Sequence, residues 1–352
     1  MVSRQPHTAS YYAATVNEVT NYSRLDADID ADVCIVGAGF TGVATALTLA
    51  ERGYSVVLLE TNRVGWGASG RNGGQVISGM SGFERIRRTH GQRIDHLLDE
   101  LRWRGNDIIR ERVSKYGIDC DLKDGFVEVA CKARQLDYLE ACAKERASSN
   151  SGHRYELWDR ATTQRMLGTD AYLGGFACFR DGHLHPLNLC IGEARAAAGL
   201  GVRIHEASPV VRIEHQQRPV VRTDCGSVRA DAVVLAGNAY SKLEPQSLSN
   251  LVFPAGSYII ATERLPDELA ASINREDVAV CDVNNVVDYF RPSADKRLLF
   301  GGACNYSGRD PRSISKFMLP RLLKIYPQLQ DVKIDFEWGG KIGIVLNLSL
   351  IH

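Results

Sequence analysis

The stretch from Asp32 to Glu60 decides the fold and reads DVCIVGAGFTGVATALTLAERGYSVVLLE. Its two ends, residues 32–36 and 55–60, are short apolar runs of the kind that form buried parallel strands. Residues 41–52 between them predict a helix, and Gly53 suits the position directly after a helix. The stretch is therefore a strand–helix–strand unit, which predicts an α/β nucleotide-binding domain of the Rossmann type.

The turn between the first strand and the helix reads Gly37-Ala38-Gly39-Phe40-Thr41-Gly42, a G-x-G-x-x-G motif. The first glycine makes the tight turn, the second lets a pyrophosphate approach the backbone, and the third lets helix and strand pack closely. The helix N-terminus then offers unpaired N–H groups to the phosphates. Glu60 ends the second strand 18 residues after Gly42, where its carboxylate can accept hydrogen bonds from ribose hydroxyls. This arrangement predicts a dinucleotide site.

Glu60 and the segment after it bear on the type of dinucleotide. The negative charge of Glu60 argues against NADP, whose 2′-phosphate it would repel, but it suits both NAD and FAD. A long glycine-rich stretch, residues 63–82, comes next, where an NAD domain usually has a short connection. Such a loop can run under a longer cofactor, with Ser69 and backbone N–H groups at the pyrophosphate and Gly73-Gly74 beside a flat ring. FAD is favoured, with an NAD-dependent dehydrogenase as the alternative.

Composition excludes several other classes of protein. The chain has 352 residues, which indicates about two domains, and Lys+Arg and Asp+Glu each number 42, without the basic excess of a dedicated nucleic-acid binder. Nine cysteines without a Cys-x-x-Cys pair argue against structural zinc and indicate reduced thiols in a cytoplasmic protein.

Residues 1–20 do not read as a signal peptide, and the glycine-interrupted window 33–50 fits the strand–turn–helix better than a membrane span. The His183-x-His185 pair has no third ligand nearby, so we expect no metal site.

The remaining patterns predict a second domain threaded through the first. Apolar residues from Ile94 to Tyr116 recur at helical spacing, and residues 181–186 predict a turn before a helix that starts at Pro186. We assign residues 27–85 and 175–245 to the FAD-binding domain. Residues 86–174 and 246–346 are assigned to an α+β substrate domain with an antiparallel sheet. Its expected strands after Tyr240 span residues 257–263, 278–283, 286–291, 297–301 and 332–346.

The sequence resembles the FAD-dependent amine and amino-acid oxidoreductases of the D-amino-acid oxidase/sarcosine oxidase superfamily. The resemblance runs along nearly the whole chain, and its most specific part is Trp66 to Gln75. It also rests on residues 36–42, Glu60, residues 181–186, residues 232–240 and Trp338-Gly339-Gly340.

The resemblance implies roles for particular residues toward FAD. Gly37, Gly39, Phe40, Thr41 and Gly42 would surround the pyrophosphate, and Glu60 would hold the adenosine ribose. Further cofactor contacts are implied for Ala68, Ser69 and Gly70 along the pyrophosphate, Gly74 and Gln75 near the isoalloxazine, Val210 at the adenine and Gly237 at the end of a lining strand.

The reaction implied by the resemblance is oxidation of a small-molecule amine to an imine and then an aldehyde, with oxygen as electron acceptor. A positive group near the reduced flavin would stabilise its negative charge, and Arg71, Lys341 and Arg291 are the candidates for this catalytic role. No other catalytic residue is assigned. The sequence does not give the oligomeric state.

Two departures from the family pattern bear on activity. Relatives that act on glycine or D-amino acids carry an Arg shortly after Trp-x-Gly, where this chain has Ile342. Because Ile cannot pair with a carboxylate, the resemblance implies an amine whose oxidised carbon bears none, such as a gamma-glutamyl-linked diamine. The family also continues into a closing helix, which Asn347 to His352 do not resemble. A shortened, inactive remnant is the alternative expectation.

Overall fold

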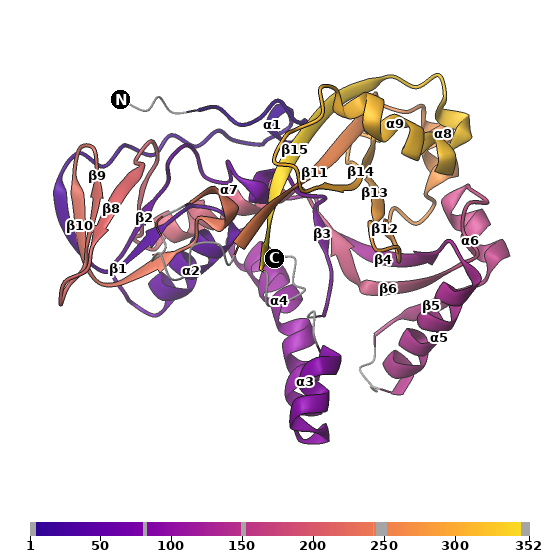
Figure 1. Ribbon diagram of the computed structural model, residues 1–352, viewed down its shortest axis with the longest axis horizontal. Coiled ribbons are helices and arrows are strands. Elements are labelled where there is room, and N and C mark those ends of the chain that lie inside the picture. The colour runs from indigo at the N-terminus through magenta and orange to yellow at the C-terminus, as the bar shows by residue number, and fades with distance from the viewer. Residues whose placement is uncertain (1–4, 80–82, 149–152, 242, 244–251, 346–352) are drawn as a thin grey trace.

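The structure is a computed structural model that describes residues 5–79, 83–148, 153–241, 243 and 252–345. Two sheets organise these residues, and Figure 1 shows them at opposite ends of the molecule, with α7 between them. The expectation about Asn347 to His352 concerns residues outside the described part.

The first sheet contains the strand–helix–strand unit. Its order is β7-β2-β1-β10-β9-β8, and β1 pairs in parallel with β2 and β10. Glycine turns at the ends of β1 and β10 lie next to each other because these two strands are neighbours. The strands are β1 (Asp28–Val36), β2 (Val56–Leu59), β7 (Arg203–His205), β8 (Val210–Glu214), β9 (Val220–Thr223) and β10 (Ser227–Leu235).

Parallel strands bury both of their faces, so each face of such a sheet needs a covering layer. Two helices cover one face of this sheet. Val43 and Leu47 of α2 (Phe40–Glu51) pack with Leu187 and Ile191 of α7 (Pro186–Gly199) against Ile35 of β1. The N-terminal segment joins the same core through α1 (Tyr11–Ala14), whose tyrosines are buried.

The second sheet has the order β15-β11-β14-β13-β12-β4-β6-β3, with β5 beside β6. Its pairs are antiparallel except β12 with β4. The predicted antiparallel sheet is thus confirmed, although it also takes strands from earlier in the chain. The strands are β3 (Gln75–Val76), β4 (Lys123–Ala130), β5 (Tyr155–Trp158), β6 (Gly174–His183), β11 (Val252–Thr262), β12 (Ala279–Asp282), β13 (Asp288–Pro292), β14 (Leu298–Asn305) and β15 (Ile334–Val345).

Most of the remaining helices pack on the second sheet, whereas α4 packs against α7. α8 and α9 lie over one face of this sheet, where Met318 and Leu322 of α9 pack with Phe290 and Phe300. The helices not yet given bounds are α3 (Phe83–His90), α4 (Asp95–Tyr116), α5 (Ala133–Ser148), α6 (Arg160–Leu167), α8 (Asp267–Ile273) and α9 (Ile314–Ile325), and the single 3-10 turns are Ala68–Gly70, Gln92–Ile94, Asn238–Tyr240 and Pro327–Leu329.

Three details differ from the sequence-based expectations. The turn expected at residues 181–186 is wrong, because β6 continues to His183 and pairs with β4 and β3. Residues 175–183 therefore hydrogen-bond into the second sheet, whereas we had assigned them to the FAD-binding domain; the domain division itself stays a prediction. The apolar face expected on α4 is also only partly buried, since Leu97 is 51% and Leu101 45% exposed. Strands β5 and β9 and helix α8 were not expected.

Candidate functional site

The glycine turn between β1 and α2 has no room for side chains. Gly37 has a φ of +105°, and a Cβ there would lie 2.7 Å from the carbonyl oxygen of Ala236. A Cβ on Gly42 would lie 1.8 Å from the carbonyl oxygen of Gly37. The first and third glycines of the motif are therefore required by the turn and by the close approach of β10 and α2.

The N-terminus of α2 is arranged to receive an anion. The Phe40 N–H donates to the Ser69 hydroxyl at 2.8 Å, and α2 has no acidic residue in its first turn. In the described ranges the N–H groups of Gly39, Thr41 and Gly42 have no hydrogen-bond acceptor. A Cβ on Gly39 would lie 2.8 Å from Ser69 Oγ and would fill the space between helix and loop. These features fit a pyrophosphate at the helix end.

Glu60 is held by the backbone at the end of β2. Its Oε2 accepts the Ala38 N–H at 2.9 Å and its Oε1 accepts the Asn62 N–H at 2.8 Å. Burial raises the pKa of the carboxyl, and the N–H donors of Asn62 and Ala38 oppose that shift. The carboxylate is thus fixed beside the glycine turn, and its remaining lone pairs fit the ribose hydroxyls of a dinucleotide.

Val210, expected at the adenine, and Gly237, expected at the end of a lining strand, both belong to the first sheet or its turns. Val210 begins β8 and packs with the apolar cluster that includes Leu59, one residue before Glu60. Gly237 follows β10, and a Cβ there would lie 2.2 Å from the side chain of Ser241.

The loop after β2 is compact and is held by contacts among its own residues. Ala68–Gly70 form a 3-10 turn, and a Cβ on Gly70 would lie 2.3 Å from the Gly65 carbonyl oxygen. The Asn72 amide donates to the carbonyls of Ala68 at 3.2 Å and Ser69 at 2.9 Å, and its Oδ1 accepts the Gly74 N–H at 2.8 Å. Asn72 therefore fixes the shape of the loop, a role that the sequence analysis missed.

The end of this loop passes into the second sheet. Gly74 has a φ of +72°, and a Cβ there would lie 2.2 Å from the Leu184 carbonyl oxygen. Gln75 begins β3, and its Nε2 donates to the Val280 carbonyl at 3.2 Å. Gly74 and Gln75 thus lie where the two sheets meet.

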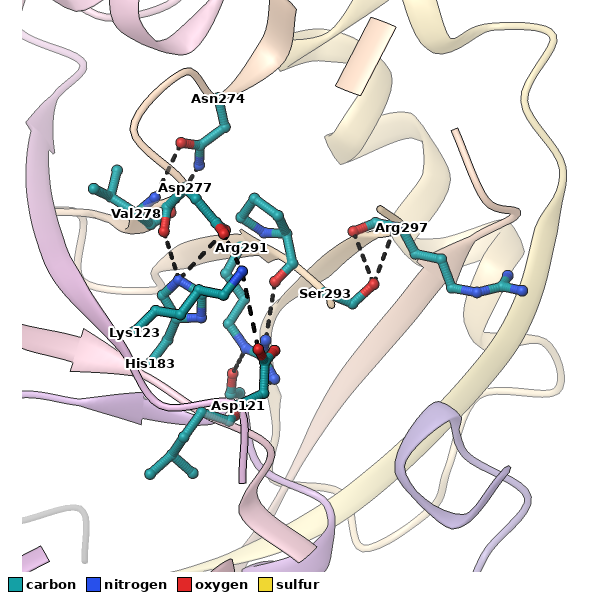
Figure 2. A network of polar contacts seen from close by, with 12 residues as sticks. Asp121, Lys123, His183, Asn274, Asp277, Val278, Arg291, Ser293 and Arg297 are labelled. Atoms are coloured by element: carbon teal, nitrogen blue, oxygen red, sulfur yellow. Dashed lines mark hydrogen bonds and ion pairs between the residues drawn. The ribbon is translucent and has the colours of Figure 1, made fainter. Parts of the chain in front are cut away.

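Arg291, one of the three cationic candidates, is 2% exposed and joins the glycine-rich loop to the second sheet through hydrogen bonds. Its Nε donates to the Gly73 carbonyl at 2.8 Å, and its Nη2 donates to the Leu184 carbonyl at 2.8 Å and the Tyr12 hydroxyl at 3.2 Å. Its Nη1 donates to the carbonyl of Pro292 at 2.9 Å. Figure 2 shows Arg291 in one polar network with Lys123, His183 and Asp277.

Burial and then the positive charge of Arg291 lower the pKa of the neighbouring His183 to about 4. The imidazole is therefore neutral at pH 7, with its Nε2 at 2.7 Å from the Asp277 carbonyl oxygen. His185 caps α7 by accepting the Asn188 N–H at 3.1 Å. Both histidines thus have structural partners, and the described residues contain no group of three His, Cys, Asp or Glu placed to hold a metal ion.

The other two cationic candidates lie at the opposite edge of the loop. The guanidinium carbon of Arg71 lies 4.4 Å from the centre of the Trp66 ring, and its Nη1 is 3.4 Å from the Gly339 carbonyl oxygen. Burial lowers the Arg71 pKa from its usual value. Lys341 is exposed, and its backbone N–H donates to the Tyr240 hydroxyl at 2.9 Å. The structure brings Arg71 and Arg291 to the loop but leaves the ammonium of Lys341 in solvent.

Two cavities of ≈ 700 Å³ and ≈ 240 Å³ lie elsewhere, in the second sheet and its helices. Neither is lined by residues 37–42 or 66–75. All nine cysteines lie in the described ranges, and none is in a disulfide. Among the helices that can be described, none combines the length and apolarity needed to cross a bilayer.

The chain is similar to known oxidoreductases along nearly its whole length. The chain is 43% identical over 344 residues to gamma-glutamylputrescine oxidoreductase of Escherichia coli (strain K12), covering 97% of this chain and 80% of that protein. It is 40% identical over 349 residues to the probable oxidoreductase OrdL of Haemophilus influenzae, again covering 97% and 80%.

Solved structures share the fold. Glycine oxidase from Geobacillus kaustophilus superimposes with a TM-score of 0.72 at 22% identity, covering 90% of this chain and 84% of that one. L-proline dehydrogenase from P. horikoshii gives a TM-score of 0.75 at 16% identity, covering 91% and 83%. Residues 32–347 match the family described as DAO, FAD dependent oxidoreductase. The chain therefore belongs to the DAO family of FAD-dependent oxidoreductases, and its cofactor is FAD.

Proposed function

We propose that this chain oxidises the C–N bond of a small amine of the gamma-glutamylputrescine kind. Bound FAD supplies the hydride acceptor: the amine loses a hydride from its α-carbon and a proton from nitrogen, water hydrolyses the imine to an aldehyde, and oxygen takes the two electrons as hydrogen peroxide. The observation that carries the proposal is the 43% identity to gamma-glutamylputrescine oxidoreductase over 97% of the chain. The α2 terminus with its three unpaired N–H groups supports the cofactor half of it.

The roles of individual residues follow from where they lie. We assign the N–H groups of Gly39, Thr41 and Gly42 to the pyrophosphate, with Gly37, Phe40 and residues 68–70 shaping the space around it. Glu60 would bind the adenosine ribose, Val210 would contact the adenine, and Gly237 would end the strand that lines the cofactor. Gly74 and Gln75 would lie beside the isoalloxazine, where Arg71 and Arg291 are the available positive charges.

The substrate preference is tied to Ile342 of β15, which pairs with Ala255 of β11. With no arginine at this position, glycine, sarcosine and D-alanine lack a partner for their carboxylates. We expect them to be oxidised far more slowly than gamma-glutamylputrescine. Hydrogen peroxide release from these four compounds, measured on protein with verified flavin absorbance near 450 nm, tests the proposal. Fast turnover of D-alanine, or a colourless protein that binds NAD instead, would contradict it.

The nine unpaired cysteines favour a reducing compartment, and we infer a cytoplasmic location from them. Fractionation of cells with an antibody against the chain tests this placement.

A further inference from the structure

Glu128 lies on the face of the second sheet that is turned toward the glycine-rich loop. Cross-strand pairing sets Glu128 of β4 opposite Cys281 of β12, and Cys281 opposite Tyr289 of β13. Residues paired directly across a sheet point to the same face. A Cβ on Gly73 of the loop would lie 2.6 Å from the Tyr289 ring, so this face meets the loop.

The same row of residues continues to the far end of the sheet. Tyr289 pairs with Gly301, Gly301 with Ile259, and Ile259 with Trp338. The Trp338 Nε1 donates to the Arg71 carbonyl at 2.9 Å, a second contact between this face and the loop. We call Glu128, Cys281, Tyr289, Gly301, Ile259 and Trp338 the inner row.

Helices pack on both faces of the sheet around Glu128: α5 lies beside it on its own face, against Ala130 and Phe176, and α9 lies on the opposite face. Val127 and Val129, the neighbours of Glu128 along β4, pack in the cluster that contains Met318 and Leu322 of α9. Because successive side chains of a strand alternate, Glu128 points away from that cluster. It lies two strand spacings from Tyr289, or about 10 Å.

The carboxylate of Glu128 has no partner within the described residues, neither a hydrogen-bond donor nor a cation. Burial first and the charge of Asp181 second raise its pKa to about 7. The charge of Glu128 also raises the pKa of three nearby groups, Tyr138 and Cys142 of α5 and Cys281 of β12. None of these groups carries a positive charge. A partly buried carboxylate without a partner is costly to keep ionised, so a cation that reaches it would gain a favourable pairing.

We propose that Glu128 is a specificity-determining residue that binds a second cationic group of the substrate, remote from the carbon that is oxidised. This inference rests on the proposed amine oxidation. The spacing of about 10 Å from Tyr289 suits an elongated substrate whose oxidised end lies at the loop and whose ammonium lies at the other end. The substrate class is then an amine with a distant ammonium group, as at the glutamyl end of a gamma-glutamyl-linked diamine.

The test compares gamma-glutamylputrescine with N-glutarylputrescine, which lacks only the α-ammonium. The unmodified protein should have a kcat/KM at least tenfold higher for gamma-glutamylputrescine than for N-glutarylputrescine. The difference should come from a lower KM, with similar kcat. Glu128→Gln should remove this preference without changing kcat for N-glutarylputrescine or the flavin spectrum, and Glu128→Asp should keep part of it. Glu156→Gln on the same sheet is the matched control, because Glu156 already has Arg154 and Trp158 as partners. A preference that survives in Glu128→Gln would overturn the proposal.

A binding measurement separates this inference from the proposed reaction. Gamma-glutamylethylamide carries the glutamyl ammonium but no terminal amine, and calorimetry should find it bound at least tenfold more weakly by Glu128→Gln. If the flavin-loaded protein oxidises neither putrescine compound, the proposed function fails, and the calorimetric comparison still decides the role of Glu128. Equal affinity in the two proteins would refute that role.

Discussion

The Ser69 hydroxyl accepts the Phe40 N–H at 2.8 Å and so joins two glycine-rich segments 29 residues apart. Phe40 is the first residue of α2, and its N–H has no acceptor inside the helix. The loop after β2 thereby caps the helix to whose N-terminus we assign the pyrophosphate. Loop and helix are positioned together, which explains how a segment with little regular structure can form part of a cofactor site.

Ser69→Ala should weaken both the fold and flavin retention. The change removes a cap, which costs about 1 kcal/mol of stability. Thermal unfolding and flavin content per chain after gel filtration measure the two effects. Ser272→Ala is a suitable control, since its hydroxyl is exposed and only donates to the Leu269 carbonyl. Unchanged flavin content in Ser69→Ala would show that the cap does not serve the cofactor.

Gly39→Val should abolish flavin binding and leave a folded chain. The new Cβ would lie 2.8 Å from Ser69 Oγ and displace the loop from the helix end. Gly105→Ala is the control, because it lies in α4 with no atom within 4 Å of the added Cβ. Circular dichroism and the absorbance near 450 nm distinguish loss of cofactor from loss of fold. A yellow Gly39→Val protein with the affinity of the parent would remove the phosphate-loop assignment.

Glu60→Ala should weaken FAD binding by a few kcal/mol at most, because one or two hydrogen bonds to a charged group are lost. The affinity is measured by titrating the flavin-free protein with FAD and following flavin fluorescence. Glu60→Gln should lie between Ala and the parent, since it keeps one acceptor oxygen but loses the charge. Affinities that do not differ among the three proteins would mean that Glu60 does not hold the ribose.

Arg291→Met should destabilise the protein by at least about 3 kcal/mol, because it leaves several buried carbonyl acceptors without a donor. Lysine at this position keeps the charge but cannot reach Gly73, Leu184 and Pro292 together, so Arg291→Lys should also be destabilised. Arg229→Met, at an exposed position of β10, should change stability by less than about 0.5 kcal/mol. Urea unfolding of the four proteins makes the comparison. A neutral Arg291→Met would contradict the role of Arg291 as a clamp between loop and sheet.

The strand–helix–strand unit and its glycine turn were predictable because their signals are local. Each strand is a continuous apolar run, and a Cβ on Gly42 would meet Gly37 of the same turn. Strand β6 was missed for a different reason. Asp181-Gly182-His183 has the composition of a turn, yet a Cβ on Gly182 would lie 2.0 Å from the Lys123 carbonyl oxygen, so the glycine is there for close strand pairing.

The contacts that escaped prediction depend on distant partners. Arg291 binds Gly73, which is 218 residues away, and no pattern near either residue indicates the contact. Glu128 sits in an ordinary-looking strand, and only the register of β4 with β12 reveals which face it occupies. A sequence motif predicts the nucleotide site, whereas no motif points to the substrate side.

The stability of the protein should depend on pH through Glu128. Burial raises the pKa of this carboxyl from 4.5 to about 7 in the folded chain. Between these values the folded state binds more protons than the unfolded state, so the free energy of unfolding falls as the pH rises from 4.5 to 7. One pKa unit corresponds to about 1.4 kcal/mol, which limits the contribution of Glu128 to roughly 3 kcal/mol.

Glu128→Gln isolates this contribution, because its amide stays neutral at every pH while the other groups titrate as before. We expect the variant to match the parent near pH 4.5 and to become progressively more stable than the parent up to pH 7, with a constant difference above it. Urea unfolding at half-unit pH steps, on protein without substrate, gives the two curves. Parallel curves over the whole range would mean that Glu128 ionises in the folded chain as easily as in the unfolded one, and that its carboxylate already has a partner.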